Sequence, residues 1–173
     1  SHCIEGRRGT RLGFGVGLLP NQPDYAFEVA AAIGHPQLDA AILILSEDAT
    51  ATDIEVQPIP LNREPPAQAL LGREVEAAGY GETYDVSREG RYFAVVQLIA
   101  IQGTTVVVDG RGRQGICFGD SGGPVMATDS DGSTTVLGVE SWGDPSCVGV
   151  DHLVRLDAIA PWIDSMTESV DRE

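Results

Sequence analysis

The sequence contains no lysine, and its charge balance limits the partners that it can bind. All 11 basic residues are arginines, and 26 acidic residues give a formal net charge of −15. A nucleic-acid surface needs a stripe of positive charge, so the composition excludes this class of partner. The absence of Lys beside abundant Arg and Ala is typical of a GC-rich bacterial genome.

Long hydrophobic runs are also absent. No run of 18 or more apolar residues occurs, so no segment is predicted to span a membrane. The first residues have neither a signal peptide nor a starting Met, and we expect that the chain is clipped upstream. With 173 residues, 42% of them hydrophobic, the chain suits one domain or two small subdomains. We expect an acidic monomer that is secreted or periplasmic.

Cysteine is scarce, and its count of three is odd. We pair Cys117 with Cys147 and leave Cys3, near the start, unpaired. A zinc site is the competing interpretation, but the sequence lacks the C-x-x-C and H-x-x-x-H spacings of such sites. We therefore expect neither a metal nor a cofactor.

Most of the chain reads as short strands. Apolar or alternating runs rich in Val and Ile are separated by Gly, Pro, Asn or Asp, which is typical of a sandwich or barrel. The runs are 11–19, 26–33, 40–45, 53–61, 74–81, 93–101, 104–110, 134–143 and 152–156.

One helix is predicted, over residues 157–171. Apolar residues recur there at three-and-four spacing, with Asp157 as the N-cap and Pro161 in the first turn. The stretch 62–72 contains two prolines and no clear period, so we place a boundary between two subdomains there.

The stretch ICFGDSGGPV, residues 116–125, sets a single serine among glycines. A serine hydroxyl is a poor nucleophile until a base removes its proton, and the base needs a third group to orient it. Flanking glycines let backbone N–H groups converge on the negative charge that develops during attack. The alternative is a turn in which Ser121 caps a backbone group. Because GDSGGP arises by chance only about once in 10⁷ positions, we favour a nucleophile.

Five motifs together resemble the trypsin- or chymotrypsin-like serine proteases, and the order His, Asp, Ser along the chain is that of this family. The resemblance runs from the first residue to about Ile163. It implies an all-β fold of two Greek-key β-barrels, the first of them incomplete, with a C-terminal α-helix. The parts would be a first-barrel remnant (1–62), a second barrel (63–156) and the helix (157–171). The motifs are SHC at 1–3, HPQLDAAILIL at 35–45, GYG at 79–81, GDSGGP at 119–124 and SWG at 141–143.

The resemblance implies a role for each matching residue. Ser121 would be the nucleophile, His2 the general acid and base, and Asp39 the group that orients His2. A carboxylate at the start of a hydrophobic run needs a buried partner, which favours this role for Asp39 over a plain turn residue. The N–H groups of Gly119 and Ser121 would form the oxyanion hole.

The substrate-binding residues are also implied. The edge that pairs with the substrate backbone would comprise Ser141, Trp142 and Gly143, and the disulfide would frame the primary specificity pocket. Trypsin-like relatives have an acid six residues before the nucleophile, where this chain has Gly115. Asp151, on the far wall of the pocket, or Glu140 could attract a basic side chain instead. Without such a carboxylate, an open pocket would take medium apolar residues.

Activation concerns Asp120. In this family a new N-terminal ammonium inserts beside the Asp that precedes the serine. The ammonium of Ser1 is tied within one residue, about 3.8 Å, of His2 and cannot reach both places. A buried, unpaired Asp120 would cost about 3–5 kcal/mol or distort its loop. We expect that an upstream segment or an activating protease completes the enzyme and that the bare chain is weakly active or inactive.

The predicted function is a serine endopeptidase that cleaves polypeptides through an acyl-enzyme. The alternatives are a protease-like binding module without catalysis and a carbohydrate- or ligand-binding β-sandwich. His35 and His152 are predicted to be loop and pocket-rim residues. The stretch DSDG, residues 129–132, is predicted to be a hairpin turn rather than a calcium loop.

Overall fold

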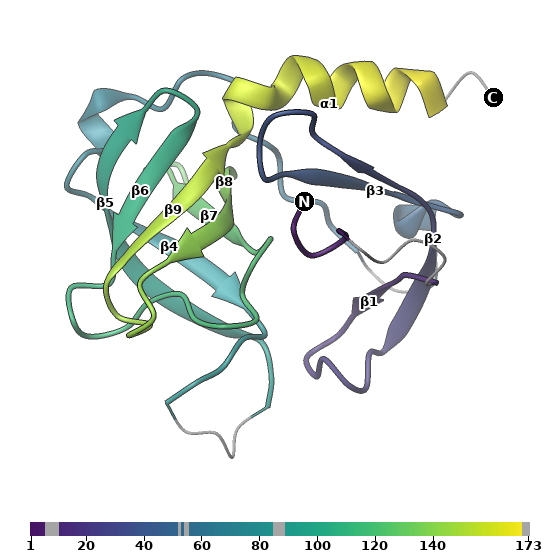
Figure 1. Ribbon diagram of the computed structural model, residues 1–173, viewed down its shortest axis with the longest axis horizontal. Helices are drawn as coiled ribbons and strands as arrows, with labels where there is room; N and C mark the ends of the chain where they lie inside the picture. The colour runs from purple at the N-terminus through teal and green to yellow at the C-terminus, as the bar shows by residue number, and fades with distance from the viewer. Residues whose placement is uncertain (6–10, 52, 54–55, 85–88, 171–173) are drawn as a thin grey trace.

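The computed structural model describes residues 1–5, 11–51, 53, 56–84 and 89–170. Within them the chain forms a three-stranded sheet, a closed barrel of six strands and one α-helix. Figure 1 shows the barrel on the left, the sheet on the right and helix α1 lying across the top of both. The N-terminal residues lie on the side of the sheet that faces the barrel (Figure 1).

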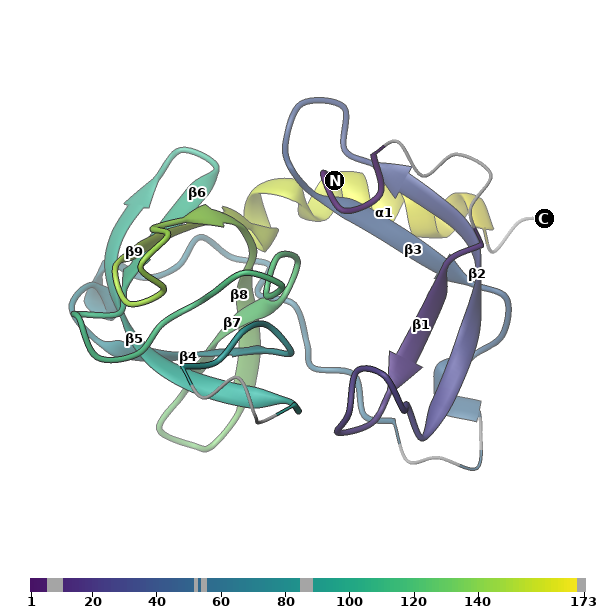
Figure 2. The ribbon, with the colours of Figure 1, turned by 60° about the horizontal axis from the view of Figure 1, so that its bottom comes forward.

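The barrel is built from antiparallel hairpins and contains the larger core. Its strand order is β4-β5-β6-β9-β8-β7, and pairing of β4 with β7 closes it (Figure 2). Inward apolar side chains such as Leu98, Val106, Val125 and Leu153 are at most 1% exposed, and their burial drives closure of the barrel. The strands are β4 (Glu74–Gly79), β5 (Tyr92–Gln102), β6 (Thr105–Asp109), β7 (Pro124–Thr128), β8 (Thr134–Gly143) and β9 (Val150–Arg155).

The sheet comprises β1 (Gly13–Val16), β2 (Tyr25–Gly34) and β3 (Ala41–Leu45), in that order. Phe27 on β2 is buried, and its ring contacts those of Phe14 and Tyr25. Leu43 and Tyr25 remain partly exposed. Two short 3₁₀ turns, η1 (Ala49–Ala51) and η2 (Gln68–Leu70), lie between the sheet and the barrel in the sequence.

Helix α1 (Leu156–Val170) follows β9 and packs against both the barrel and the loop before β3. Its residues Leu156 and Ile159 share a buried cluster with Val136 and Val154 of the barrel and with Ala40 of the loop before β3. His35, at the start of that loop, packs edge-on against Trp162 of the helix. The helix therefore holds the loop 35–40 against the barrel.

The mostly-β class, one closed barrel and the C-terminal helix are confirmed. That the three-stranded sheet is the remnant of the first of two barrels stays a prediction. The hairpin turn at 129–132 is confirmed, because Asp129 N–H donates to Ser133 O across the end of β7 and β8. No helix in the described part of the chain is long and apolar enough to cross a membrane.

Three local predictions are wrong. Residues 56–60 of the predicted strand 53–61 form no strand, because Pro58 and Pro60 lack the N–H that a ladder requires; positions 54 and 55 lie outside the described residues. Strand β7 was not predicted, because its residues continue the glycine-rich motif without alternation. Asp157 is not the N-cap: helix α1 begins at Leu156, and the Asp157 carboxylate accepts hydrogen bonds from the Arg155 guanidinium.

Candidate active site

His2 and Asp39 form a hydrogen-bonded pair between the sheet and the barrel. His2 Nδ1 lies 2.6 Å from Asp39 Oδ2, and the backbone N–H of His2 donates to Asp39 Oδ1 at 2.8 Å. The contact fixes the ring: an ionised carboxylate accepts the Nδ1 proton, which leaves the lone pair on Nε2. The His2 side chain is 46% exposed, so Nε2 is able to act as a base toward a bound substrate.

The turn that carries Asp39 is closed by local hydrogen bonds. His35 Nδ1 accepts the N–H groups of Gln37 and Leu38 at 3.2 and 3.1 Å, and the backbone N–H of His35 donates to Ala40 O. Because Ala40 is buried beside helix α1, the carboxylate of Asp39 projects from a fixed turn.

Ser141, on β8 of the barrel, also binds Asp39. Its hydroxyl donates to Asp39 Oδ2 at 2.7 Å, and the ammonium of Ser1 contacts Oδ1. Burial raises the pKa of Asp39, but the hydrogen bonds from Ser1, His2 and Ser141 outweigh it and hold the pKa well below its usual range. Sequence reasoning placed Ser141 only at the substrate edge. The SWG motif was the available signal for this second contact.

Ser121 lies on an exposed loop next to these residues. The loop is joined to β8, because Gly122 N–H donates to Glu140 O at 2.8 Å and Glu140 N–H donates to Gly123 O at 2.9 Å. Cys3, the neighbour of His2, places its thiol 3.9 Å from Ser121 O. Ser121 thus contacts Cys3, the chain neighbour of His2. Gly122, which follows Ser121, is bonded to Glu140, the chain neighbour of Ser141. Among the described residues, no hydrogen bond joins the His2 ring to Ser121 Oγ.

Two backbone N–H groups beside Ser121 are free to bind an anion. Within the described part of the chain, neither Gly119 N–H nor Ser121 N–H has a hydrogen-bond acceptor. Gly119 has a φ of 96°, and a Cβ there would lie 3.1 Å from Gly81 Cα. This conformation strongly favours glycine. Paired free donors beside a hydroxyl have the character of an oxyanion hole.

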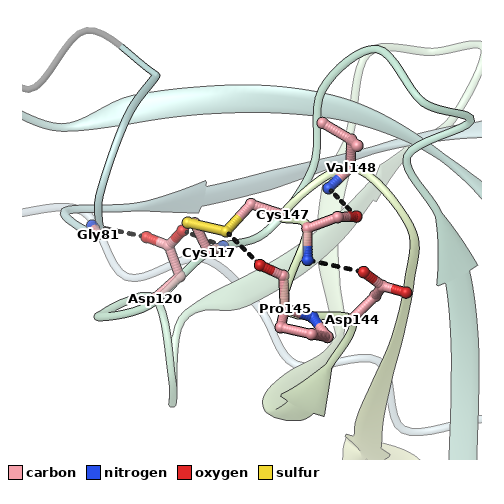
Figure 3. Close-up of a disulfide and its surroundings, with 8 residues drawn as sticks. Gly81, Cys117, Asp120, Asp144, Pro145, Cys147 and Val148 are labelled. Atoms are coloured by element: carbon pink, nitrogen blue, oxygen red, sulfur yellow. Dashed lines mark hydrogen bonds between the residues drawn. A yellow bond between two sulfur atoms is a disulfide. The ribbon is translucent and has the colours of Figure 1, made fainter.

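The Asp120 carboxylate binds two backbone amides. It accepts the N–H of Gly81 at 2.7 Å and that of Cys117 at 2.9 Å (Figure 3). A Cβ on Gly79 or Gly81 would lie 1.9 or 2.6 Å from Asp120 Oδ1, so the GYG motif leaves room for this side chain. The unpaired Asp120 that the sequence suggested is not found, because two amides replace the ammonium as its partners.

The disulfide joins Cys117 to Cys147, and Cys3 is free and exposed. Figure 3 shows the bond tying the loop before Ser121 to the turn that follows β8. Gly115 lies against this turn: a Cβ there would meet Cys147 O at 2.7 Å. Any larger residue at position 115 would require the disulfide turn to move.

A cavity of about 550 Å³ opens beside the disulfide. It is lined by residues 77–79, 81–84, 92–94, 113–117 and 146–148. Asp120, Gly123 and Glu140 also line it. Of the residues expected to bind substrate, Gly115 lines the cavity, whereas Ser141, Trp142, Gly143 and Asp151 do not.

Glu140 and Asp151 are buried carboxyl groups, 5% and 2% exposed. Burial raises the pKa of Glu140 to about 8, with further contributions from the negative charges of Asp151 and Asp120. Burial also raises the pKa of Asp151 to about 6, although the Ile116 N–H opposes the shift. Asp151 lies directly beneath Gly143, where a Cβ would come within 1.6 Å of Oδ1.

The exposed end of β8 carries an aromatic stack. Trp142 is 62% exposed, and its ring lies parallel to that of His152 at a centroid distance of 3.7 Å. Burial lowers the pKa of His152, so its ring is neutral near pH 7. Among the described residues, no group of three His, Cys, Asp or Glu side chains is arranged to hold a metal ion.

A closed β-barrel, a neighbouring sheet, and a His–Asp pair beside a glycine-flanked serine are consistent with a protein of the chymotrypsin-like fold. The family model described as Trypsin matches residues 1–163, and the chain belongs to this family of trypsin-like serine proteases. Polypeptides are the substrates that the family implies. A comparison with curated proteins returns no match.

Proposed function

We propose that this protein is a serine endopeptidase in which Ser121, His2 and Asp39 carry out acyl transfer. The proposal is supported above all by one observation: the Asp39 carboxylate accepts hydrogen bonds from His2 and from Ser141 at 2.6 and 2.7 Å. An imidazole oriented in this way beside an exposed serine is the arrangement that nucleophilic catalysis requires.

The mechanism follows from these positions. His2 Nε2 takes the proton of Ser121 Oγ as the oxygen attacks the peptide carbonyl carbon, and Asp39 stabilises the resulting imidazolium. The N–H groups of Gly119 and Ser121 bind the oxyanion of the tetrahedral intermediate. His2 then gives its proton to the leaving amine, and an acyl-enzyme remains. Water, deprotonated by His2, releases the second product.

The substrate is a polypeptide that pairs as an added strand along Ser141, Trp142 and Gly143. The disulfide favours an oxidising compartment, so we infer a secreted or periplasmic location. We also propose that the chain consists of a first-barrel remnant (1–62), a second barrel (63–156) and a helix (157–171). The enzyme would act as a monomer and without a cofactor.

Asp120 is proposed to be linked to activation. In this chain the Ser1 ammonium binds Asp39, and Asp120 is satisfied by amides of Gly81 and Cys117. An ammonium from an upstream segment would have to replace those amide contacts, and the oxyanion loop would respond because Asp120 adjoins both Gly119 and Ser121.

A serine-directed fluorophosphonate tests the proposal. The chain is incubated with the reagent, and the labelled peptide is identified by mass spectrometry. Label is expected on Ser121, is expected to vanish in Ser121→Ala and His2→Ala, and is expected to persist in the exposed hairpin variant Ser130→Ala. A folded chain that hydrolyses no peptide and takes up no label would favour the binding-module alternative.

A further inference from the structure

Trp142 lies face to face with His152 at the exposed end of β8. The ring centroids are 3.7 Å apart, and the ring planes are within 10° of parallel. The contact joins two strands, because Trp142 on β8 pairs with His152 on β9 in the antiparallel register. Side chains at paired positions lie on the same face of a sheet, so the two strands hold the rings together.

An irregularity in the pairing of β8 with β9 sets the direction of these side chains. The register shifts between Glu140 and Trp142, which makes Ser141 the extra residue of a bulge. A bulge re-aims the side chains around it. Ser141 donates its hydroxyl to Asp39, and Trp142 follows on the face that carries His152. The bulge therefore places the stack one residue from the carboxylate of the proposed triad.

Trp142 needs a packing partner because it is 62% exposed. An apolar ring in water is driven onto whatever surface lies within its reach. For this indole, the nearest surface is the backbone edge 141–143, along which the substrate is proposed to pair. Stacking on His152 removes one face of the indole from water without covering that edge.

The contacts of His152 are limited to this stack and its strand neighbours. Among the described residues its side chain forms no hydrogen bond and no ion pair, and burial is the sole cause that lowers its pKa. Its partner on β6 is Val107, which does not titrate. Its chain neighbour Asp151 is buried and lies on the opposite face of β9. The ring of His152 is therefore placed for packing against Trp142 and not for polar contacts.

We propose that His152 is a positioning residue for substrate binding, which holds the indole of Trp142 against β9 and so keeps the edge 141–143 open to the substrate backbone. The inference rests on the proposed function, because it concerns binding at that same site. No described contact joins His152 to Ser121 or His2, so its loss should change KM and leave the chemical step intact. The effect should be confined to substrates long enough to reach the edge.

Two substrates of different length test the proposal. One is a fluorogenic tetrapeptide amide, Ala-Ala-Pro-Xaa, and the other is the amide of Xaa alone, where Xaa is the residue that the wild-type protein cleaves fastest. His152→Ala should raise KM for the tetrapeptide about 3- to 10-fold, as expected for loss of an aromatic pair, with kcat within about twofold. The kinetics of the single-residue amide should not change.

Two further variants separate ring stacking from a general loss of structure. His152→Phe keeps a flat ring at the paired position and should restore the KM of the tetrapeptide. Thr134→Ala removes a cross-strand contact with Thr128 at the other end of β8 and should leave this KM unchanged.

Fluorescence tests the stack without catalysis. The chain has two tryptophans, so Trp162→Phe leaves Trp142 as the sole emitter. A protonated imidazole in contact with an indole quenches its emission. Emission should therefore fall as the pH is lowered, with a midpoint below 6.5 because burial lowers the pKa of His152. The transition should be absent from Trp162→Phe/His152→Phe.

The outcomes distinguish the two levels of the argument. An unchanged tetrapeptide KM in His152→Ala, no restoration by His152→Phe, or an equal loss with both substrates overturns the positioning role and leaves the protease intact. Emission of Trp142 that does not respond to pH in a folded variant overturns the stack itself. Absence of both hydrolysis and phosphonate labelling at Ser121 overturns the proposed function, and the role of His152 falls with it.

Discussion

Replacement of Glu140 by Gln should remove most of the pH dependence of stability between pH 4.5 and 8. The native pKa of this carboxyl is about 8, against an ordinary value of 4.5. Between these values the native state keeps the proton and the unfolded chain loses it, so stability falls as the pH rises. A difference of about 3.5 units corresponds to a loss of about 5 kcal/mol at most.

Neighbouring carboxyl groups set the rest of the profile. Asp151, whose pKa rises from 3.8 to about 6, contributes a loss of about 3 kcal/mol at most between those values. Asp39 acts in the opposite sense: its lowered pKa stabilises the fold above pH 3.8, and this stability is lost as the pH falls. The negative charges acting on the buried pair are Asp120, Asp144 and Asp109. Maximal stability is therefore expected near pH 4–5, between the two opposing effects.

The assay is chemical unfolding, followed by tryptophan fluorescence without reductant, at pH 5, 6.5, 8 and 9. The wild-type chain should lose several kcal/mol between pH 5 and 8, and Glu140→Gln should lose only the part due to Asp151. Glu82→Gln should follow the wild type, because its carboxylate is exposed. A Glu140→Gln profile parallel to that of the wild type would refute the assignment of the buried charge.

Three further outcomes are expected. Asp39→Asn should lower kcat by about 10⁴-fold with little change in KM, because the amide favours the wrong tautomer of the histidine; steady-state kinetics measures this. Gly119→Val should lower kcat by about 10²–10³-fold, since a branched residue cannot hold the positive φ that aims the amide, and an unchanged rate would contradict the assigned oxyanion hole. Double replacement of Cys117 and Cys147 by Ser should cost about 3–4 kcal/mol in urea unfolding for a loop of 30 residues, whereas Cys3→Ser, the control, should cost little.

Local chemistry made much of the site predictable. A reactive serine, its base and its carboxylate have to be particular residue types, and the glycines around Ser121 have to permit a positive φ, as Gly119 does. These requirements produce a motif, GDSGGP at 119–124, that is very unlikely to arise by chance. The apolar alternation of 93–101 and the helical spacing after 157 likewise reflect one buried face each, and both elements are found.

The local errors have equally local causes. The run 53–61 alternates polar and apolar residues as a strand does, yet two prolines deprive it of donors, and only Leu61 makes a bridge, to Val136. Strand β7 carries three consecutive buried residues, Val125, Met126 and Ala127, because a register shift after Val125 breaks the alternation that would have revealed it.

The order of the motifs along the chain was enough to name the family and to propose His2, Asp39 and Ser121, because the chemistry restricts which residues can stand there. Only the tertiary structure determines which of the charged and polar groups contact one another. The Ser1 ammonium reaches Asp39 across 38 positions, and Asp120 finds amides instead. A register shift between Glu140 and Trp142 interrupts the alternation of β8, so the sequence does not predict which face of the strand Glu140 occupies. The raised pKa of Glu140 follows from its burial and from the charges of Asp151 and Asp120. Burial and through-space charge depend on every segment packed around a group, and a linear pattern of residues does not record them.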